Sequence, residues 1–341
     1  MTQKKSIAFA KVQKYITRGP GTIEPPCPSF GPPLFCGGCD WLDLSYETQL
    51  KYKTELVKEQ IQSLNSRIDI PDTIASPITQ HYRNKAFMPV GKGEKSLEYG
   101  IYERWSHKIV PHKSCILHPP EFDLIAHRCL ELMDNAKVQP YDETTHTGTL
   151  RHIGFRCSQD RKQILLILVT RSAKLPFSNL LVKKLCSEFP QISGIVQNIN
   201  REKGNVILGD EEKILYGNPW IMEKINNLKF RIHYKSFWQV NSDMLQMIIK
   251  YIKDKVQPED TVLDTFSGIG VLGLSLAQKV KEVVCIEELA DAVEDGKFNC
   301  QLNHISNVVF HCGKTEDKLP EILNHTDKYT PNIPEVIILD P

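Results

Sequence analysis

The feature that most constrains the fold is an alternation of strand-like and helix-like segments that begins after residue 260. Residues 261–280, TVLDTFSGIGVLGLSLAQKV, contain a hydrophobic strand, a glycine turn and a helix in succession. Residues 282–289 and 307–317 form the next two strands, separated by a helix at 290–304, and PEVIILDP at 334–341 forms a fourth strand. This alternation is typical of a parallel sheet with helices on both faces, so we predict an α/β fold.

The glycine turn and the end of the second strand are suited to bind a nucleotide-like ligand. Gly268 and Gly270 let the backbone turn tightly, and Glu287 follows Asp264 by 23 residues, where its carboxylate can accept hydrogen bonds from two ribose hydroxyls. NAD enzymes and methyltransferases that use S-adenosylmethionine (SAM) share this spacing. The turn D-x-F-x-G-x-G and the terminal Asp340-Pro341 favour SAM. An α/β domain with an empty crevice is the alternative.

Ten cysteines in a 341-residue chain without a secretory signal point to a reducing compartment, and we expect a cytoplasmic protein. Cys27, Cys36 and Cys39 lie in the Pro/Gly-rich run GPGTIEPPCPSFGPPLFCGGC, and Cys115 lies far downstream. Four thiolates can hold a [4Fe–4S] cluster or a zinc ion. Three close cysteines in an irregular loop with one distant cysteine favour the cluster over zinc or a chance grouping of free thiols.

Charge is distributed unevenly, although the whole chain carries a net charge of +1. Residues 1–250 contain 34 basic and 25 acidic side chains, whereas residues 251–341 contain 8 and 16. A basic front fits a polyanionic partner, although two unrelated domain surfaces would give the same pattern. The chain has no run of eighteen apolar residues, so we expect no membrane span.

Three further segments are candidates for contacts with RNA or for structure. In the run His81–Lys85, Tyr can stack on an unpaired base while Arg and Lys meet phosphate. A second basic patch is expected at Arg151, Arg156, Arg161 and Lys162. In the run Phe237–Asn241 we expect two core aromatics, with Gln239 and Asn241 able to hydrogen-bond a ligand.

The remaining sequence predicts one helix and a β-rich region. Residues 45–64 show helical spacing, with a buried stripe expected at Tyr46, Leu50, Val57, Ile61 and Leu64. Short β-type segments dominate residues 77–235, including two strands around a polar turn between Arg151 and Arg171.

These motifs make the chain similar to the RNA uracil-5-methyltransferase family. The resemblance rests on C-GG-C, YRNK, F-W-Q-V-N, DTFSGIG, Glu287, the pair Asn299/Asn303 and the terminal LDP, and it runs from Cys27 to the last residue. It is strongest to the bacterial iron–sulfur 23S ribosomal RNA (uracil-5-)-methyltransferases. It implies that SAM is contacted by Gln239, Phe266, Glu287 and Asp340, and that a [4Fe–4S] cluster is ligated by Cys27, Cys36, Cys39 and Cys115.

The sequence pattern and the resemblance together predict four segments in the chain. We expect a basic N-terminal arm at 1–26, an iron–sulfur loop and helix at 27–76, a β-rich central RNA-binding domain at 77–235, and a Rossmann-like SAM-binding domain at 236–341. The central domain contains the fourth cluster cysteine, Cys115. The methyltransferase domain is expected to be incomplete at its C-terminus.

The implied reaction is methylation of C5 of a uridine in 23S ribosomal RNA through a covalent cysteine–C6 adduct. In the family the nucleophilic cysteine and the general base follow the DP motif, so we expect no catalytic residue before Pro341 and a C-terminally truncated chain. Ribosomal RNA is the expected partner, with no membrane and no obligate protein partner. The alternatives are a non-catalytic RNA-binding protein that retains both sites, and an NAD-linked oxidoreductase.

Overall fold

The computed structural model describes residues 2–4, 7–9, 12, 14–64, 67–324 and 334–340. Internal contacts divide the chain into two compact units. Unit 1 comprises residues 1–81 and 88–152, and unit 2 comprises residues 82–87 and 153–341. The segment boundaries predicted at 26/27, 76/77 and 235/236 remain predictions, because the two units do not test the four predicted segments.

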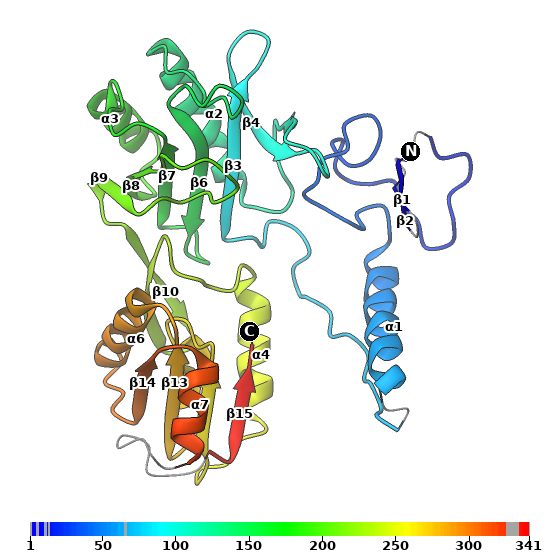
Figure 1. The fold of residues 1–341 in the computed structure, drawn as a ribbon, viewed down its shortest axis with the longest axis vertical. Helices are drawn as coiled ribbons and strands as arrows, with labels where there is room; N and C mark the ends of the chain where they lie inside the picture. The colour runs from blue at the N-terminus through cyan, green and yellow to red at the C-terminus, as the bar shows by residue number, and fades with distance from the viewer. Residues whose placement is uncertain are drawn as a thin grey trace. The chain divides into compact units, whose positions relative to one another are not determined.

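Unit 1 contains a small antiparallel sheet in the order β5-β4-β3 (Figure 1). Its strands are β3 (Lys85–Lys92, of which residues 88–92 belong to unit 1), β4 (Leu97–Tyr102) and β5 (Ile109–Pro111). A separate antiparallel pair is formed by β1 (Thr2–Lys4) and β2 (Ile7–Phe9).

Helix α2 (Pro120–Asn135) lies in the region that the sequence predicts as β-rich. It buries Phe122, Ile125 and Cys129, and it meets β4 through a 2.9 Å hydrogen bond from the Tyr99 hydroxyl to Asp123. The sequence does contain a pattern typical of the start of a helix, because a proline stands in the first turn together with Glu121 and Asp123. The prediction that β-type segments dominate residues 77–235 did not include this helix.

The predicted helix at 45–64 is confirmed as α1 (Tyr46–Leu64), but its buried stripe was wrong in part. Val57 is 49% exposed, whereas Thr54 is buried. The Thr54 hydroxyl accepts a hydrogen bond from the Thr73 amide, and the Tyr46 hydroxyl accepts one from the Ser76 amide. The helix therefore meets the segment that follows it through polar groups, which hydrophobic periodicity does not reveal.

Unit 2 begins with a mixed sheet in the order β6-β7-β8-β9. The two predicted strands around a turn are confirmed as β6 (Leu150–Cys157, of which residues 153–157 belong to unit 2) and β7 (Ile164–Thr170). Helix α3 (Ser178–Glu188) connects β7 to the parallel strand β8 (Ile192–Ile199), which pairs with antiparallel β9 (Glu211–Gly217). All seven residues of β7 are buried.

A hairpin and a helix follow in unit 2. The hairpin pairs β10 (Trp220–Ile225) with β11 (Leu228–His233), and α4 (Ser242–Lys253) comes next. One hydrophobic core contains Val169 of β7, Phe230 of β11, Leu245 of α4 and Val262, so the parts of unit 2 share an interior.

The predicted alternating region is confirmed as a four-stranded parallel sheet in the order β14-β13-β12-β15. Its elements are, in chain order, β12 (Thr261–Thr265), α5 (Val271–Leu276), β13 (Glu282–Glu287), α6 (Ala290–Leu302), β14 (Val308–Cys312), α7 (Thr315–Leu323) and β15 (Val336–Leu339). The strands of this sheet are seen together in the lower part of Figure 1.

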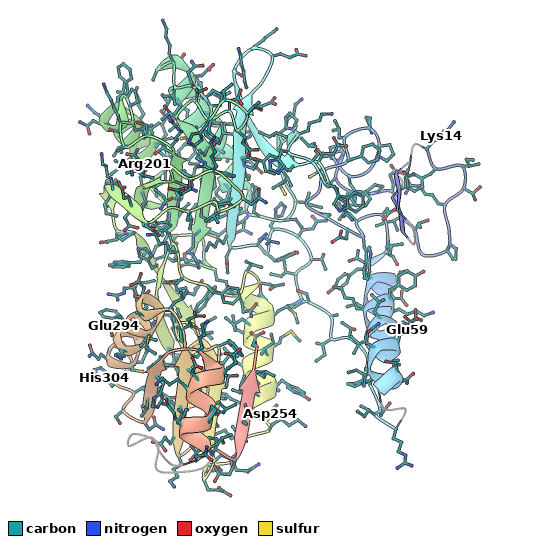
Figure 2. The ribbon with its side chains drawn as sticks, in the orientation of Figure 1. Lys14, Glu59, Arg201, Asp254, Glu294 and His304 are labelled. Carbon is teal, nitrogen blue, oxygen red and sulfur yellow. The ribbon has the colours of Figure 1, made fainter. Side chains whose placement is uncertain are left out.

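The paired asparagines of α6 attach the helix to β11. Asn299 and Asn303 are one turn apart, and each side chain both accepts from and donates to the backbone of a β11 residue, Arg231 and Lys229 respectively. Glu294, labelled in Figure 2, is exposed on the same helix. The N-x-x-x-N spacing therefore has a structural role, because it satisfies the free edge of a strand.

Candidate functional site

The order of the parallel sheet places a switch point between β12 and β15. The chain runs outward from β12 through β13 to β14, and β15 then returns to the other side of β12. In open α/β sheets, ligands bind outside the carboxyl ends of the strands at such a point. Phe266 follows β12 and Asp340 follows β15, so two of the predicted SAM contacts lie at this edge.

The glycine turn after β12 has free space beside one glycine and tight packing beside another. Phe266, Gly268 and Gly270 all have left-handed backbone angles. A β-carbon on Gly268 would meet no atom within 4 Å, whereas one on Gly270 would lie 2.6 Å from the Phe310 ring. Gly270 therefore allows close packing, and the backbone at Gly268 is accessible to a ligand.

Glu287, at the end of β13, ties the turn to the following loop. One carboxylate oxygen accepts from the Gly268 amide and the other from the Leu289 amide, each at 2.8 Å. A carboxylate offers about four acceptor positions, so both oxygens keep capacity for a second donor. Glu287 is half-buried, which leaves its carboxylate able to meet ribose hydroxyls.

Asp264 is a buried acid at the end of β12, and the sequence analysis assigned no role to its side chain. Its carboxylate accepts from the Gly273 amide at 2.9 Å. Burial raises the pKa of Asp264 to about 7, and the negative charges of Asp340 and Glu287 act in the same direction, while the Gly273 amide opposes them. The site is therefore rich in negative charge, which favours a cationic ligand.

The last predicted SAM contact, Gln239, lies beside Asp340. Its amide nitrogen donates to the Asp340 carboxylate at 3.1 Å. The structure thus joins Gln239 with Asp340, and it places Phe266 on the glycine turn and Glu287 at the end of β13, bonded to that turn. Phe266 is 39% exposed, so its ring is available for contact with a ligand.

Asn84 holds the loop that contains Gln239, a role that sequence reasoning missed. Its backbone amide donates to Val240, and its side-chain amide donates to the Gln239 carbonyl at 3.0 Å and the Ser242 hydroxyl at 3.1 Å. Asn84 is buried at 5% exposure. The only signal was its place in the YRNK motif, which we interpreted as an RNA-contacting strand; β3 begins at Lys85 instead.

The predicted basic patches are only partly on the surface. Arg83 and Lys162 are exposed, but Arg151 and Arg156 are buried, so the prediction that these two arginines face RNA was wrong. Arg156 lies on β6 and donates to the Ser236 carbonyl, which places it in the interior. Burial, with the nearby charge of Arg156, lowers the pKa of Lys85 to about 7.

The two aromatics before Gln239 have opposite environments. Trp238 is 2% exposed and belongs to the core as predicted, whereas Phe237 is 68% exposed, so its assignment to the core was wrong.

The four predicted cluster cysteines lie near one another in unit 1. Burial, together with the neighbouring Cys115, Cys36 and Cys27 thiols, raises the pKa of Cys39 to about 12. All four are half-buried and outside any disulfide. Within the described ranges, no group of three or more His, Cys, Asp or Glu side chains is arranged as a metal site. The structure thus brings the four thiols together without showing a metal centre.

Of the six other cysteines, four are buried, Cys186 on α3 is half-buried with a pKa that burial raises, and Cys312 is exposed. Cys129, Cys157, Cys285 and Cys300 are buried, and burial raises the pKa of Cys129 to about 12 and of Cys300 to about 11. Cys312 is exposed at the end of β14, where its thiol lies 3.7 Å from the Glu288 carbonyl.

None of the helices in the described part of the chain has the length and apolar character needed to cross a membrane.

Comparison with known proteins gives one family. Residues 45–328 match the model of the family described as tRNA (Uracil-5-)-methyltransferase. The chain is 34% identical over 321 residues to an uncharacterized RNA methyltransferase of Halalkalibacterium halodurans, covering 93% of this chain and 69% of the relative. It is 32% identical over 340 residues to another from Listeria innocua, covering 99% and 73%.

One solved structure has the same fold over most of the chain. It is the Pyrococcus abyssi tRNA (uracil-54, C5)-methyltransferase in complex with S-adenosyl-L-homocysteine, with a TM-score of 0.72 and 23% sequence identity, covering 87% of this chain and 67% of that one.

Proposed function

Because the chain belongs to the tRNA (uracil-5-)-methyltransferase family, we propose that it takes part in transfer of a methyl group from SAM to C5 of a uridine in RNA. The observation that carries the proposal is the edge of the parallel sheet, where the glycine turn, Glu287 and the Gln239–Asp340 pair meet at the switch point. Family membership does not favour the non-catalytic alternative.

The residues at this edge fit SAM in charge and in hydrogen bonding. Bound SAM would supply an electrophilic methyl group on a sulfonium cation. Glu287 would hold the ribose hydroxyls with its remaining acceptor positions, and Gly268 would let the ligand approach the backbone. Asp340, held by Gln239, adds negative charge beside a cation, and Phe266 offers an exposed ring. The neighbour with S-adenosyl-L-homocysteine supports this assignment.

The proposed reaction is nucleophilic catalysis on the base. Uracil C5 becomes nucleophilic when a thiolate adds to C6, and C5 would then take the methyl group from the sulfonium. A general base removes the C5 proton, and the C6–S bond breaks so that the thiolate leaves. Because stacking hides C6, the uridine must be unpaired or flipped out.

We place the nucleophile and the base outside residues 1–341. The burial of Cys129, Cys157, Cys285 and Cys300 supports this proposal, because a buried thiol is poorly accessible to a base. Burial also raises the pKa of Cys129, Cys285 and Cys300, which makes their thiols poor nucleophiles. Cys27, Cys36, Cys39 and Cys115 are assigned to the cluster. Two thiols remain, Cys186, which is half-buried on α3, and Cys312, which is exposed at the end of β14. If either thiol acts as the nucleophile, this placement is wrong.

The finer proposal is a 23S ribosomal RNA target and a [4Fe–4S] cluster. The mutual proximity of the four thiols supports a cluster, since each of Cys36, Cys39 and Cys115 is influenced by the Cys27 thiol. The cluster would be bound by the four cysteine thiolates, and these bonds would order the Pro/Gly-rich loop without any need for electron transfer. The ribosomal RNA target rests on the resemblance alone.

A methyl-transfer assay tests the function. The 341-residue protein is incubated with tritium-labelled SAM and unmodified 23S ribosomal RNA, with transfer RNA as the comparison substrate. The proposal expects SAM to bind without turnover. Incorporation at uracil C5 would support the activity and move the nucleophile to a cysteine of this chain, whereas failure to bind SAM would contradict the proposal.

A further inference from the structure

A small pocket with several aromatic walls lies in unit 1, beside the predicted cluster cysteines Cys36 and Cys39, which also line it. Its volume is about 220 Å³, and its walls include Tyr15, Phe30, Phe35 and Trp105 together with Arg104. Pockets for drug-sized ligands are larger, about 300–1,000 Å³. The walls and the size suit one flat ring system.

Trp105 presents most of its surface in this region. It is 72% exposed, and the Arg104 guanidinium lies 5.8 Å from the centre of its ring. The ring stands on the turn between β4 and β5, where Ser106 donates to Glu103 and Glu103 donates to Lys108. A Trp side chain that is this exposed contributes little to the hydrophobic core of unit 1.

The backbone of Trp105 also favours a different residue. Its φ angle is +58°, a left-handed conformation that suits glycine and strains a bulky side chain. Such positions persist where the surroundings hold them, and they gather at binding sites. The turn is held by the loop of Phe35, whose carbonyl accepts from the Arg104 amide, and by the Gly37 amide, which donates to Tyr102 at 3.0 Å.

We propose that this pocket binds one unpaired base of the RNA, with Trp105 as the stacking platform. The inference rests on the proposed function, because it takes RNA as the partner. Every base has a π-face, so an exposed Trp beside an Arg is suited to stacking without sequence preference. The charges nearby fit a polyanion only moderately, since Arg104 is paired with Asp40 and Arg18 with Glu24, while Lys14 lines the adjoining hollow (Figure 2). Stacking is therefore expected to contribute more here than phosphate contact.

The test replaces the ring without straining the turn. Trp105→Gly removes the aromatic surface and relieves the left-handed backbone, so its melting temperature should equal or exceed that of the parent protein. Phe177→Gly is the matched control, because Phe177 is 63% exposed with a φ of +59° and does not line the pocket. Trp105→Tyr keeps a flat ring and should retain most of the binding.

The measurement is fluorescence anisotropy with a labelled single-stranded RNA of about 12 nucleotides and mixed sequence, and with the same strand annealed to its complement. Trp105→Gly should raise the Kd for the single strand at least about fivefold, with unchanged salt dependence and little effect on the duplex. SAM affinity and iron content should stay as in the parent protein.

The outcomes separate the two proposals. If Trp105→Gly binds the single strand within twofold of the parent protein, the stacking site is wrong while the RNA function stands. A loss that comes with a reduced salt slope would mean that a phosphate contact was removed, and it would also overturn the stacking site. If the parent protein binds neither RNA, the proposed function itself fails and takes the inference with it.

Discussion

The glycine turn of unit 2 and the cysteine loop of unit 1 are both irregular segments, yet different forces hold them. The turn at residues 266–270 lies on a parallel sheet whose strands are buried, and the Gly268 amide is bonded to Glu287. The cysteine loop at residues 27–39 is rich in proline and glycine and contains no helix or strand, and its cysteines are only half-buried. A hydrophobic core orders the first segment, whereas the second is held by backbone hydrogen bonds such as those from Cys36 to Ser29 and from Gly37 to Tyr102. The proposed cluster would add crosslinks to this loop.

The largest expected effect comes from removing one crosslink. Cys39→Ser should lower the iron and sulfide content from about four of each per chain to near zero, and the 27–39 loop should become open to proteolysis. SAM affinity should stay unchanged, because the sheet edge is ordered by its own core. Cys186→Ser is the control, since Cys186 is half-buried outside the four-cysteine set. Stoichiometric zinc without sulfide in the parent protein would contradict the cluster.

The buried acid of the sheet gives the next effect, and it depends on pH. The native pKa of Asp264 is raised to about 7, so the folded state holds a proton more tightly than the unfolded state. The stability from this proton is fully present below pH 3.8 and is lost as pH rises to about 7. Asp264→Asn keeps an acceptor for Gly273 and should gain stability relative to the parent protein by up to about 1.4 kcal/mol per pH unit in this window.

Urea unfolding at several pH values measures this difference. Asp254→Asn is the control, because Asp254 is exposed at the end of α4 and is paired with Lys250 (Figure 2). Parallel pH profiles for the parent protein and Asp264→Asn would mean that Asp264 is not a buried acid of raised pKa.

Two alanine substitutions in the glycine turn should separate packing from ligand access. Gly270→Ala should lower the free energy of unfolding by roughly 1–3 kcal/mol, because its β-carbon would meet Phe310 and Leu274 and its φ is +77°. Gly268→Ala meets no neighbour, so its stability cost should be about 1 kcal/mol from backbone strain, but SAM affinity should fall. Thermal melts and calorimetric titration check both. Equal loss of SAM affinity at matched stability would show that the two glycines do not differ in role.

The smallest effect is expected at Asn84, which acts through Gln239. Asn84→Ala removes two side-chain hydrogen bonds to the loop, each worth about 0.5–1.5 kcal/mol, and should weaken SAM binding several-fold. Asn84→Ser is the partial rescue, because its hydroxyl can donate one hydrogen bond. Unchanged SAM affinity in the alanine variant would show that the loop holds Gln239 without Asn84.

The elements of the sheet could be predicted because their signals are local. The strands, the glycine turn and Glu287 follow one another within a few dozen residues, and the structure has them in the predicted order. The predicted SAM contacts come from the resemblance, and the structure places all four at this edge while leaving their binding to experiment.

The features that sequence reasoning missed depend on contacts between distant residues. Asn84 donates to a carbonyl 155 residues away, and no local pattern encodes that contact. Arg151 and Arg156 were expected on the surface because of their charge, but they lie on a buried strand. The exposure of Val57 shows the converse, since helical periodicity does not tell which apolar positions find a partner.

The central claim is that the edge of the parallel sheet binds SAM through Glu287. Calorimetric titration of the 341-residue protein with SAM, and of Glu287→Ala, tests it most directly, with Glu288→Ala as the control for an exposed neighbouring acid. Loss of a charge-assisted acceptor costs about 1.5–3 kcal/mol, so the Kd should rise more than tenfold in Glu287→Ala and stay within twofold in Glu288→Ala. An unchanged Kd in a Glu287→Ala protein that melts as the parent does would contradict the account.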